Sequence, residues 1–391
     1  MKNIKIGLFG FGVVGEGIYK VLSQKPDIGV EVNKVVIKHL DKERNAPITL
    51  FSTDPAAILD DPEIDLVVEL IDDAHAALEI VTTAIKRGKS VVSANKKMIA
   101  ENHTTLIKLS KEYKVSFLYE AAVCGSVPII RNLEEYFVND KLKSIRGIVN
   151  GSTNYILNKM DENNESYESV LKEAQEKGFA ESDPTLDVEG YDAAHKLSII
   201  ALHAFGKIIP YELILRKGVT SLQPFDFKYA KEKGLVIKLI AKCKTDESGE
   251  LNSLSVIPEF IDKNTTLGRT NLEFNGVLIE SSLADEQFLY GKGAGRFPTS
   301  SAVLSDISAL RYHYQYEYKK GTLEYLPKNE GLAKFYVSFN NDYVVDNSIF
   351  DKIEEQYNDG KRTYLIGMIQ WQKLQKSFIL SNPNISLISS N

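Results

Sequence analysis

A glycine-rich turn between a predicted strand and a predicted helix constrains the fold more than any other feature. Residues 2–9, KNIKIGLF, alternate and are rich in β-branched side chains, which predicts a strand. GFGVVG follows at once, and VGEGIYKVLSQ then has helical spacing. In this context the Gly-x-Gly-x-x-Gly pattern is typical of a dinucleotide-binding turn, where glycines allow a tight turn, a close approach to pyrophosphate and close helix packing. The expected cofactor contacts are Gly10, Phe11, Gly12, Val13, Val14 and Gly15.

Strands and helices continue to alternate beyond this turn. Strands are predicted over 31–40, 64–70, 89–94 and 115–123, and helices over 75–88 and 104–113. This order predicts an α/β fold with a Rossmann-type, doubly wound parallel sheet. Ligands bind at the carboxyl ends of such strands. We therefore expect Ser93 and Lys96 near the cofactor, with Glu120 just before a turn at the end of another strand.

The end of the second predicted strand bears on the type of cofactor. An acidic residue near this position typically binds the ribose hydroxyls of NAD. Lys38, Lys42 and Arg44 cluster there instead. Cations suit a 2′-phosphate, so we expect NADP, with NAD as the alternative. A merely solvated basic turn would produce the same pattern.

Five carboxylates between residues 181 and 192 precede a helix that has no broad polar face. Residues 193–205 are apolar on nearly every side, which is typical of a buried helix. Asp192 and Lys196 share one face at the start of this helix. An exposed ion pair is the ordinary alternative, but it fits a buried helix poorly. Buried charges are paired or functional, and a lysine in such a place is suited to passing a proton.

The loop before this helix supplies further candidates. Glu181 follows Gly178 at a loop tip and is suited to binding a cationic group such as a substrate ammonium. Asp187 is equally compatible with a ligand contact and with a turn or cap. Asp183 precedes Pro184, which favours a turn. His195 and His203 are expected to be structural.

Composition excludes several classes of partner. The 391 residues carry a net charge of −6, which argues against nucleic acid and anionic membranes as partners. No apolar run reaches the ~18 residues of a membrane span. The apolar N-terminal run is cut by glycines and lacks a small-residue cleavage site, so we do not interpret it as a signal peptide. Two cysteines make no disulfide framework, which fits a cytoplasmic protein.

Together these motifs resemble the homoserine dehydrogenases. The resemblance covers residues 1 to about 315 and rests on GFGVVG, SANK, YEAAVCGSVPI, VNGSTNYIL, GFAESDPTLDVEGYDAAHKL and GKGAGRFPTSSAVLSD. It implies NAD(P)H-dependent reduction of L-aspartate 4-semialdehyde to L-homoserine, a step of threonine and methionine biosynthesis, by a homodimer. It also implies an NAD(P)-binding domain over 1–127, to which 293–315 returns, and an α+β catalytic and dimerisation domain over 128–292.

The resemblance further implies roles for particular residues. Lys196 is the proton donor to the aldehyde oxygen, and Lys96 is a second active-site lysine that touches substrate and nicotinamide. Glu181, Asp187 and Asp192 bind the substrate, Glu181 through its ammonium. Gly178 and Gly293 approach the cofactor. A sodium ion is held by a glutamate and backbone carbonyls, and the matching positions are Glu120, Val123, Gly125 and Val127.

The chain departs from the family pattern at several positions. Asp72 and Asp73 stand where glycines are usual, close to the expected nicotinamide half of the cofactor. Lys292 and Arg296 add cations beside the expected pyrophosphate, although solvent exposure is an equal interpretation. Lys38 stands where the family often has arginine, which weakens the NADP prediction.

Residues 330–391 are predicted to form a separate short α+β extension. The segments 333–341, 348–357 and 362–374 are interpreted as strand, helix and strand. Many family members carry a regulatory amino-acid-binding domain here. The expected turn of that domain is absent, so a packing or oligomer role is favoured over control by threonine. Trp371 is expected in a core.

Two other functions remain open at this point. A phosphorylating semialdehyde dehydrogenase would use Cys124 as its nucleophile, although buried inert cysteines are commoner. A non-catalytic NADP(H) sensor would bind the cofactor without turnover. The paired Asp192 and Lys196 argue against a sensor, which has no use for a proton donor.

Overall fold

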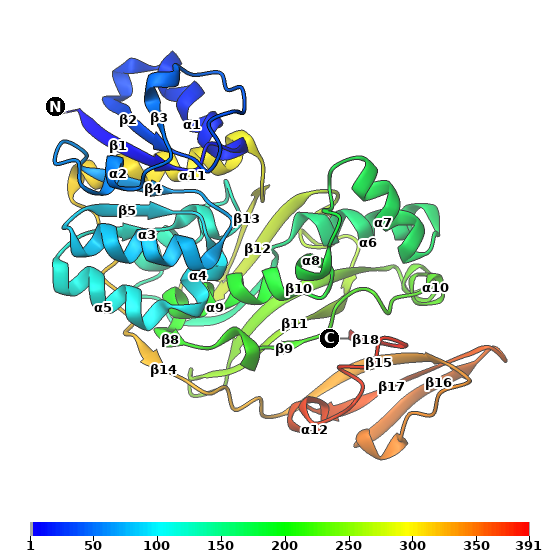
Figure 1. Cartoon of the computed structure of the whole chain (residues 1–391). Helices are drawn as coiled ribbons and strands as arrows, with labels where there is room; N and C mark the ends of the chain where they lie inside the picture. Colours follow the sequence, from blue (N-terminus) through cyan, green and yellow to red (C-terminus); the bar gives the residue numbers. More distant parts are fainter. Residues whose placement is uncertain (1–2, 391) are drawn as a thin grey trace. The chain divides into compact units, whose positions relative to one another are not determined.

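The computed structural model describes residues 3–390, which form two compact units. The first contains the chain up to Val138 together with 292–323, and the second contains 139–291 together with 324–390. The expected NAD(P)-binding domain, residues 1–127 with 293–315, lies within the first unit. Figure 1 labels most of the helices and strands of both units. Within residues 3–390, no helix has the length and hydropathy that a membrane span requires.

A six-stranded parallel sheet forms the centre of the first unit, in the order β3-β2-β1-β4-β5-β6. Its strands are β1 (Ile4–Phe9), β2 (Val30–Val36), β3 (Phe51–Ser52), β4 (Leu66–Glu69), β5 (Ser90–Ser93) and β6 (Phe117–Leu118). The order reverses direction at β1, so the crevice beside the carboxyl ends of β1 and β4 is the expected ligand position. The predicted doubly wound sheet is confirmed.

Helices cover both faces of this sheet. Helix α3 packs on α5, and α1 packs on α11, which returns from the second stretch of the unit. The helices are α1 (Val13–Gln24), α2 (Ala56–Leu59), α3 (Ala74–Lys86), α4 (Lys96–Glu101), α5 (His103–Tyr113) and α11 (Arg296–Ala309). Ser300 on α11 donates its hydroxyl to the Val14 carbonyl of α1 at 3.2 Å.

The strand predicted over 115–123 is wrong in its second half. Only Phe117–Leu118 pair with β5, and residues Glu120–Ala122 form a 3₁₀ turn. The reason is that the Glu120 backbone N–H donates to Asp306 on α11 at 2.8 Å, which takes the chain away from the sheet. A continuous apolar run does not reveal such a turn.

The second unit is built on a large mixed sheet in the order β13-β12-β7-β10-β11-β18-β15-β17-β16, with β9 beside β11. The strands are β7 (Leu142–Ile148), β9 (Leu215–Arg216), β10 (Leu235–Thr245), β11 (Leu251–Asp262), β12 (Phe274–Ser281), β13 (Glu286–Lys292), β15 (Leu332–Asn340), β16 (Lys352–Asn358), β17 (Arg362–Gln370) and β18 (Ile385–Ser389). The short strands β8 (Lys207–Ile208) and β14 (Leu323–Glu324) lie outside this sheet.

Helices α6, α9 and α10 pack against β10 of this sheet. The helices of the unit are α6 (Gly151–Asn163), α7 (Tyr167–Glu176), α8 (Thr185–Val188), α9 (Tyr191–Phe205), α10 (Pro224–Glu232) and α12 (Trp371–Gln375). All residues of α9 from Asp192 to Ala204 are buried, so the predicted buried helix is confirmed. His195 and His203 lie inside it, and the His195 ring packs 4.2 Å from the ring of Tyr211.

The prediction for the C-terminal segment is wrong in two respects. Residues 330–390 do not stand apart, because β18 pairs with β11 and the sheet is continuous. Residues 352–358 form edge strand β16 rather than a helix, although Glu and Gln favour helices. Pairing with β17 decides the conformation, and charged side chains are common on edge strands. Trp371 lies in a core with Leu215 and Ile257, as predicted.

Candidate active site

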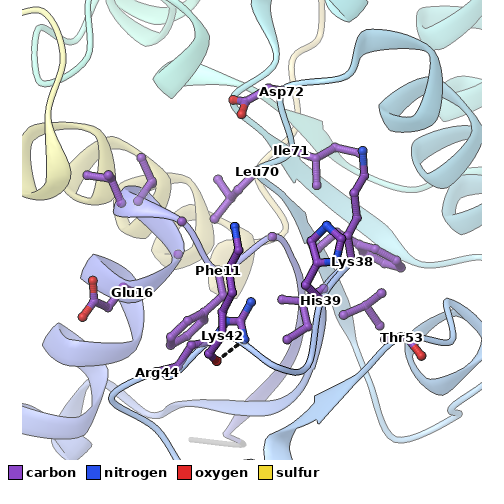
Figure 2. Close-up of a pocket in the computed structure, with 18 of the residues that line it drawn as sticks. Phe11, Glu16, Lys38, His39, Lys42, Arg44, Thr53, Leu70, Ile71 and Asp72 are labelled. Atoms are coloured by element: carbon purple, nitrogen blue, oxygen red, sulfur yellow. Dashed lines mark hydrogen bonds between the residues drawn. The ribbon is translucent and has the colours of Figure 1, made fainter.

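A pocket of about 1370 Å³ opens at the carboxyl ends of β1, β2 and β4 in the first unit. Figure 2 shows its lining, which comes from the turn after β1, the basic loop after β2 and the turn after β4. All six residues from Gly10 to Gly15 line it. The predicted cofactor residues of this turn therefore share one cavity.

The three glycines of the turn differ in what surrounds them. Gly10 has a φ of 97°, and a β-carbon there would lie 2.9 Å from the Leu70 carbonyl oxygen. A β-carbon on Gly15 would lie 2.5 Å from the Gly10 carbonyl oxygen. At Gly12 a β-carbon would meet nothing within 4 Å. Gly10 and Gly15 thus shape the turn, while Gly12 keeps its backbone open to a ligand at the start of α1.

The basic cluster lies on the side of the pocket formed after β2. Lys38, His39, Lys42 and Arg44 all line the cavity, and Figure 2 shows the hydrogen bond from Arg44 to the Lys42 carbonyl, 2.7 Å long. The Arg44 guanidinium also lies 5.4 Å from the centre of the Phe51 ring. These contacts hold Arg44 at the pocket, while Lys38, His39 and Lys42 are exposed at its rim.

The turn after β4 forms another part of the lining. Leu70, Ile71, Asp72 and Asp73 all border the cavity. Asp73 caps α3, because its Oδ1 accepts the backbone N–H groups of His75 and Ala76 at 3.0 and 2.9 Å. These hydrogen bonds lower the pKa of Asp73. Asp73 therefore has a structural role at a position where glycine is usual, and Asp72 extends beside it.

Ser93 and Lys96 lie on the neighbouring strand end. Ser93 is fully buried and donates its hydroxyl to Glu69 Oε2 at 2.6 Å. Asn95 caps α4 by accepting the Met98 N–H at 2.9 Å, and Lys96 is the first residue of that helix. Ser93 thus contacts Glu69 beneath the strand ends. Neither Ser93 nor Lys96 lines the described cavity.

A buried polar cluster surrounds the start of α9 in the second unit. Lys196 Nζ donates to Asp192 Oδ2 and to the Val149 carbonyl, both at 2.7 Å. The side chains of Lys196 and Asp192 are 11% and 4% exposed. The predicted buried pair therefore exists, and two of the three ammonium hydrogens of Lys196 are directed by fixed acceptors.

Sequence reasoning missed Asn150, which links the carboxylates of this cluster. Its Nδ2 donates to Asp192 Oδ2 at 2.8 Å and to Asp187 Oδ1 at 2.7 Å. Its Oδ1 accepts the Thr153 N–H at 2.9 Å and so caps α6. Asn150 precedes a helix in VNGSTNYIL, which is the signal of a cap, but the sequence does not reveal its two carboxylate partners.

The other loop residues have different environments. Asp183 Oδ1 accepts the backbone N–H and the hydroxyl of Thr185 at 3.1 and 2.6 Å, which confirms the predicted turn. Glu181 is exposed, and its backbone carbonyl accepts from Gln175 at 2.9 Å. Gly178 ends α7 with a φ of 75° and open space around it. Asp187 joins the cluster through Asn150.

The predicted sodium residues form a compact turn in the first unit. Glu120 is buried, and its two carboxylate oxygens accept the N–H groups of Ile130 and Arg131 at 2.9 and 2.8 Å. Burial raises the pKa of Glu120 despite these hydrogen bonds. Gly125 has a φ of 52° and packs so closely on the Gly293 backbone that a β-carbon would lie 2.5 Å from its carbonyl oxygen. Within residues 3–390, no cluster of three or more His, Cys, Asp or Glu side chains is arranged for a metal.

Cys124 and the cations after β13 also have clear environments. Cys124 is fully buried, which leaves its sulfur inaccessible to a substrate. Arg296 begins α11 and pairs with Glu16 of α1 at 3.0 Å. Lys292 accepts hydrogen bonds from Ser126 at its carbonyl. The extra positive charge of Arg296 is thus balanced by an acidic neighbour.

Comparison with known proteins identifies the family. A family model for homoserine dehydrogenase matches residues 128–308, and one for its NAD-binding domain matches residues 10–120. Homoserine dehydrogenase of Bacillus subtilis is 37% identical over 79% of this chain and 73% of the relative. That of Neisseria gonorrhoeae is 38% identical over 78% and 72%. A structure of homoserine dehydrogenase from Thiobacillus denitrificans has a TM-score of 0.87 at 30% identity, covering 100% and 99% of the two chains.

These similarities extend over both units, and they agree with the dinucleotide turn and the buried lysine cluster. They also exclude the alternatives built on Cys124 and on a non-catalytic sensor. The chain belongs to the homoserine dehydrogenases, nicotinamide-dependent oxidoreductases that act on a CH–OH group.

Proposed function

We propose that this enzyme reduces L-aspartate 4-semialdehyde to L-homoserine, with Lys196 as the proton donor. The observation that carries the proposal is the buried Lys196 ammonium, oriented by Asp192 and by the Val149 carbonyl. The family supports a conversion between an alcohol and a carbonyl. The buried and oriented ammonium supports Lys196 as the group that transfers the proton.

The chemistry follows from the charge that develops on the aldehyde. When bound, the reduced nicotinamide supplies the hydride. Negative charge then grows on the carbonyl oxygen, and a preorganised ammonium stabilises it without reorganisation. Two of the Lys196 hydrogens are already directed to Asp192 and Val149, so the third is available to the substrate oxygen. Lys196 donates this proton as the alkoxide forms.

Carboxylates around this lysine are proposed to bind the substrate. We assign the substrate ammonium to Glu181. Further contacts with the substrate are assigned to Asp192 and Asp187, whose carboxylates both accept from Asn150. A site built to pair an ammonium rejects analogues that lack it, because its carboxylates would be left unpaired. We assign Lys96 as a second active-site lysine that contacts substrate and nicotinamide.

We propose NADPH as the preferred cofactor, with NADH as a weaker alternative. Lys38, Lys42 and Arg44 line the pocket beyond β2, where a 2′-phosphate would lie. The pyrophosphate is assigned to the backbone from Gly10 to Gly15, with Ser93 supporting the site. Gly178 and Gly293 are further proposed positions of close approach to the cofactor.

We also propose a sodium ion held by Glu120 with the carbonyls of Val123, Gly125 and Val127. The donor set fits a hard monovalent cation, since it consists of oxygen atoms only. Each oxygen of Glu120 accepts one N–H group and retains capacity for a second contact. Glu120 would supply the charge and the carbonyls the remaining ligands.

The oligomer and cell compartment complete the proposal. We propose a cytoplasmic homodimer, without nucleic acid or membrane partners, on the basis of the family resemblance and the acidic net charge. Light scattering of the purified protein would give the mass, and a monomer at micromolar concentration would contradict the dimer.

The main test is an assay in the direction of alcohol oxidation. L-Homoserine is mixed with NADP or NAD at alkaline pH, and absorbance of the reduced nicotinamide is followed. We expect turnover with L-homoserine, faster at low NADP than at low NAD, and none with D-homoserine or L-threonine. Lack of turnover with both cofactors would overturn the proposal, and tighter NADH than NADPH binding would overturn the cofactor assignment.

The role of Lys196 is tested with a matched lysine. Lys196→Met should lower kcat by roughly 10²–10⁴-fold, the usual contribution of general acid catalysis, with NADPH affinity retained. Lys242 on β10 is the control, because its side chain is 14% exposed and pairs with Glu259. Lys242→Met leaves Glu259 paired with Arg146 at 2.7 Å, so kcat should change little. Equal effects of both changes would refute the proton-donor assignment.

A further inference from the structure

A closed ring of hydrogen bonds joins the turns that follow β4 and β5. Glu69 Oε1 accepts the Ile71 N–H at 2.7 Å, and Glu69 Oε2 accepts the Ser93 hydroxyl at 2.6 Å. Ser93 Oγ accepts the Asn95 N–H at 3.1 Å. The Asn95 amide closes the ring by donating to the Ile71 carbonyl at 3.0 Å.

This ring follows from the register of the sheet. Glu69 and Ser93 are direct partners at the last position of two neighbouring parallel strands. Side chains at such paired positions lie on the same face, so a carboxylate and a hydroxyl meet there. Ala94 N–H also donates to the Glu69 carbonyl at 3.2 Å, which fixes the same two chain segments through the backbone.

Burial of the Glu69 carboxylate costs free energy. Both Glu69 and Ser93 are 0% exposed. Burial raises the pKa of Glu69 to about 7, while the hydrogen bonds from Ser93 and Ile71 oppose the rise and Asp72 adds to it. A leucine or glutamine would cost less at a strand end that needed only packing. The carboxylate therefore points to a requirement for two strong acceptors.

The turn after β4 lines the pocket, and the turn after β5 leads into Lys96, which is proposed above as an active-site lysine. Ile71 and Asp72 line the pocket, and Figure 2 shows them on the side opposite Arg44 and Glu16. The sheet order assigns the β2 side to the adenosine half of a dinucleotide, so the β4 side takes the nicotinamide half. Asn95 starts the helix whose first residue is Lys96.

We propose that Glu69 is a positioning residue, which fixes the nicotinamide-side turn at Ile71 and the start of α4 at Lys96 relative to one another through Ser93 and Asn95. Glu69 does not contact the cofactor in this role. It acts by holding two backbone segments in the geometry that the cofactor requires. The proposal rests on a nicotinamide cofactor occupying this pocket.

The test compares cofactor binding in two pairs of variants. Glu69→Gln keeps the shape and one acceptor, but its amide nitrogen faces the Ser93 hydroxyl. Ser93→Ala removes the link directly. Each variant should raise the Kd of NADPH about tenfold, as measured by fluorescence titration. A tenfold change corresponds to the loss of one well-formed hydrogen bond to a charged group. KM for NADP should rise similarly, and KM for L-homoserine should rise as well, because the ring also fixes the start of α4, where Lys96 is assigned a substrate contact.

Two buried residues of the same unit provide the controls. Glu134 accepts the Tyr318 N–H at 3.2 Å, and Ser110 donates to the Ile107 carbonyl at 3.0 Å; both are buried and neither lines the pocket. Glu134→Gln and Ser110→Ala should leave the Kd of NADPH within about twofold. They control for loss of a buried polar group that has no link to the site.

A pH series adds a readout that a purely structural role would not affect. The strands beside Glu69 present uncharged Phe9 and Ser93, and Asp72 is the charged neighbour. The ionised carboxylate accepts both hydrogen bonds, so the affinity advantage of the wild type over Glu69→Gln should grow as pH rises from 6 to 8. Comparison with Glu69→Gln cancels titration of the cofactor itself.

The outcomes separate this proposal from the proposed function. Unchanged Kd in both Glu69→Gln and Ser93→Ala, with a wild type that binds NADPH, would overturn the positioning role alone. A wild type without NADPH affinity would overturn both. If Glu69→Gln fails to fold, Ser93→Ala decides, and an affinity within twofold of wild type refutes the role.

Discussion

Asp226 provides the most direct test of how the C-terminal strands are attached to the second unit. It is fully buried at the start of α10. Its Oδ1 accepts the hydroxyls of Tyr336 and Ser338 at 2.9 and 2.5 Å. Its Oδ2 accepts the Gln223 N–H and the Ser386 hydroxyl at 2.9 and 2.8 Å. One carboxylate thus joins α10 to two strands of the segment after 330.

The effect of Asp226→Ala can be bounded from these contacts. The Ser386 hydroxyl has a second acceptor in the Ser221 carbonyl at 2.7 Å, so its loss is small. The Tyr336 and Ser338 hydroxyls and the Gln223 N–H would lose the acceptor described here. Each buried donor left unsatisfied costs about 1–3 kcal/mol. We therefore expect the free energy of unfolding to fall by about 3–9 kcal/mol, with a drop in Tm of about 10 °C.

Thermal unfolding followed by circular dichroism measures this change. Asp246 is the control, because it is only half-buried and its carboxylate accepts hydrogen bonds within its own turn, from Ser248 and Glu250. Asp246→Ala should shift Tm by no more than about 3 °C, as for most surface substitutions. If Asp226→Ala is as stable as Asp246→Ala, the C-terminal strands are not held by this carboxylate and the reasoning is wrong.

Three other changes have definite expected outcomes. Gly12→Ala should weaken NADPH binding without changing Tm, since the added methyl meets only the open pocket; a lower Tm with normal binding would contradict this. The pKa values of Glu69 and Asp306 are both raised to about 7 by burial, so the folded state holds protons that the unfolded state releases above about pH 4. Stability should therefore fall by about 2–4 kcal/mol between pH 5.5 and 8, measured by urea unfolding, and Asp306→Asn should flatten the slope. Cys124→Ser should retain most of its kcat in the homoserine assay, and loss of turnover with normal folding would restore the thiol mechanism.

Features set by local pattern were predictable from sequence. The turn from Gly10 to Gly15 depends on residues next to one another in the chain, and the structure shows a steric reason for glycine at Gly10 and Gly15. The burial of helix α9 follows from apolar residues on nearly every side. Because the helix is buried, the sequence predicts that Asp192 and Lys196 form a buried pair rather than an exposed one.

Features that depend on distant partners were not predictable. Asn150 binds carboxylates 37 and 42 residues away, and Glu69 meets Ser93 only because two strands align in register. A single sequence contains no signal for such pairs. The same reason explains the error over 348–357, since strand β16 is stabilised by β17 and its own residues favour a helix.

The position of β18 in the large sheet has a consequence for biosynthesis. Strand β18 is translated after all other strands of this sheet, yet it lies between β11 and β15 and joins them. Until residues 385–389 leave the ribosome, β15 exposes an unpaired edge and β11 has only the short strand β9 beside it, apart from β10. Such edges promote aggregation of nascent chains. Completion of the sheet therefore waits until β18 has been translated, and expression yield should depend on chaperones that bind β-edges.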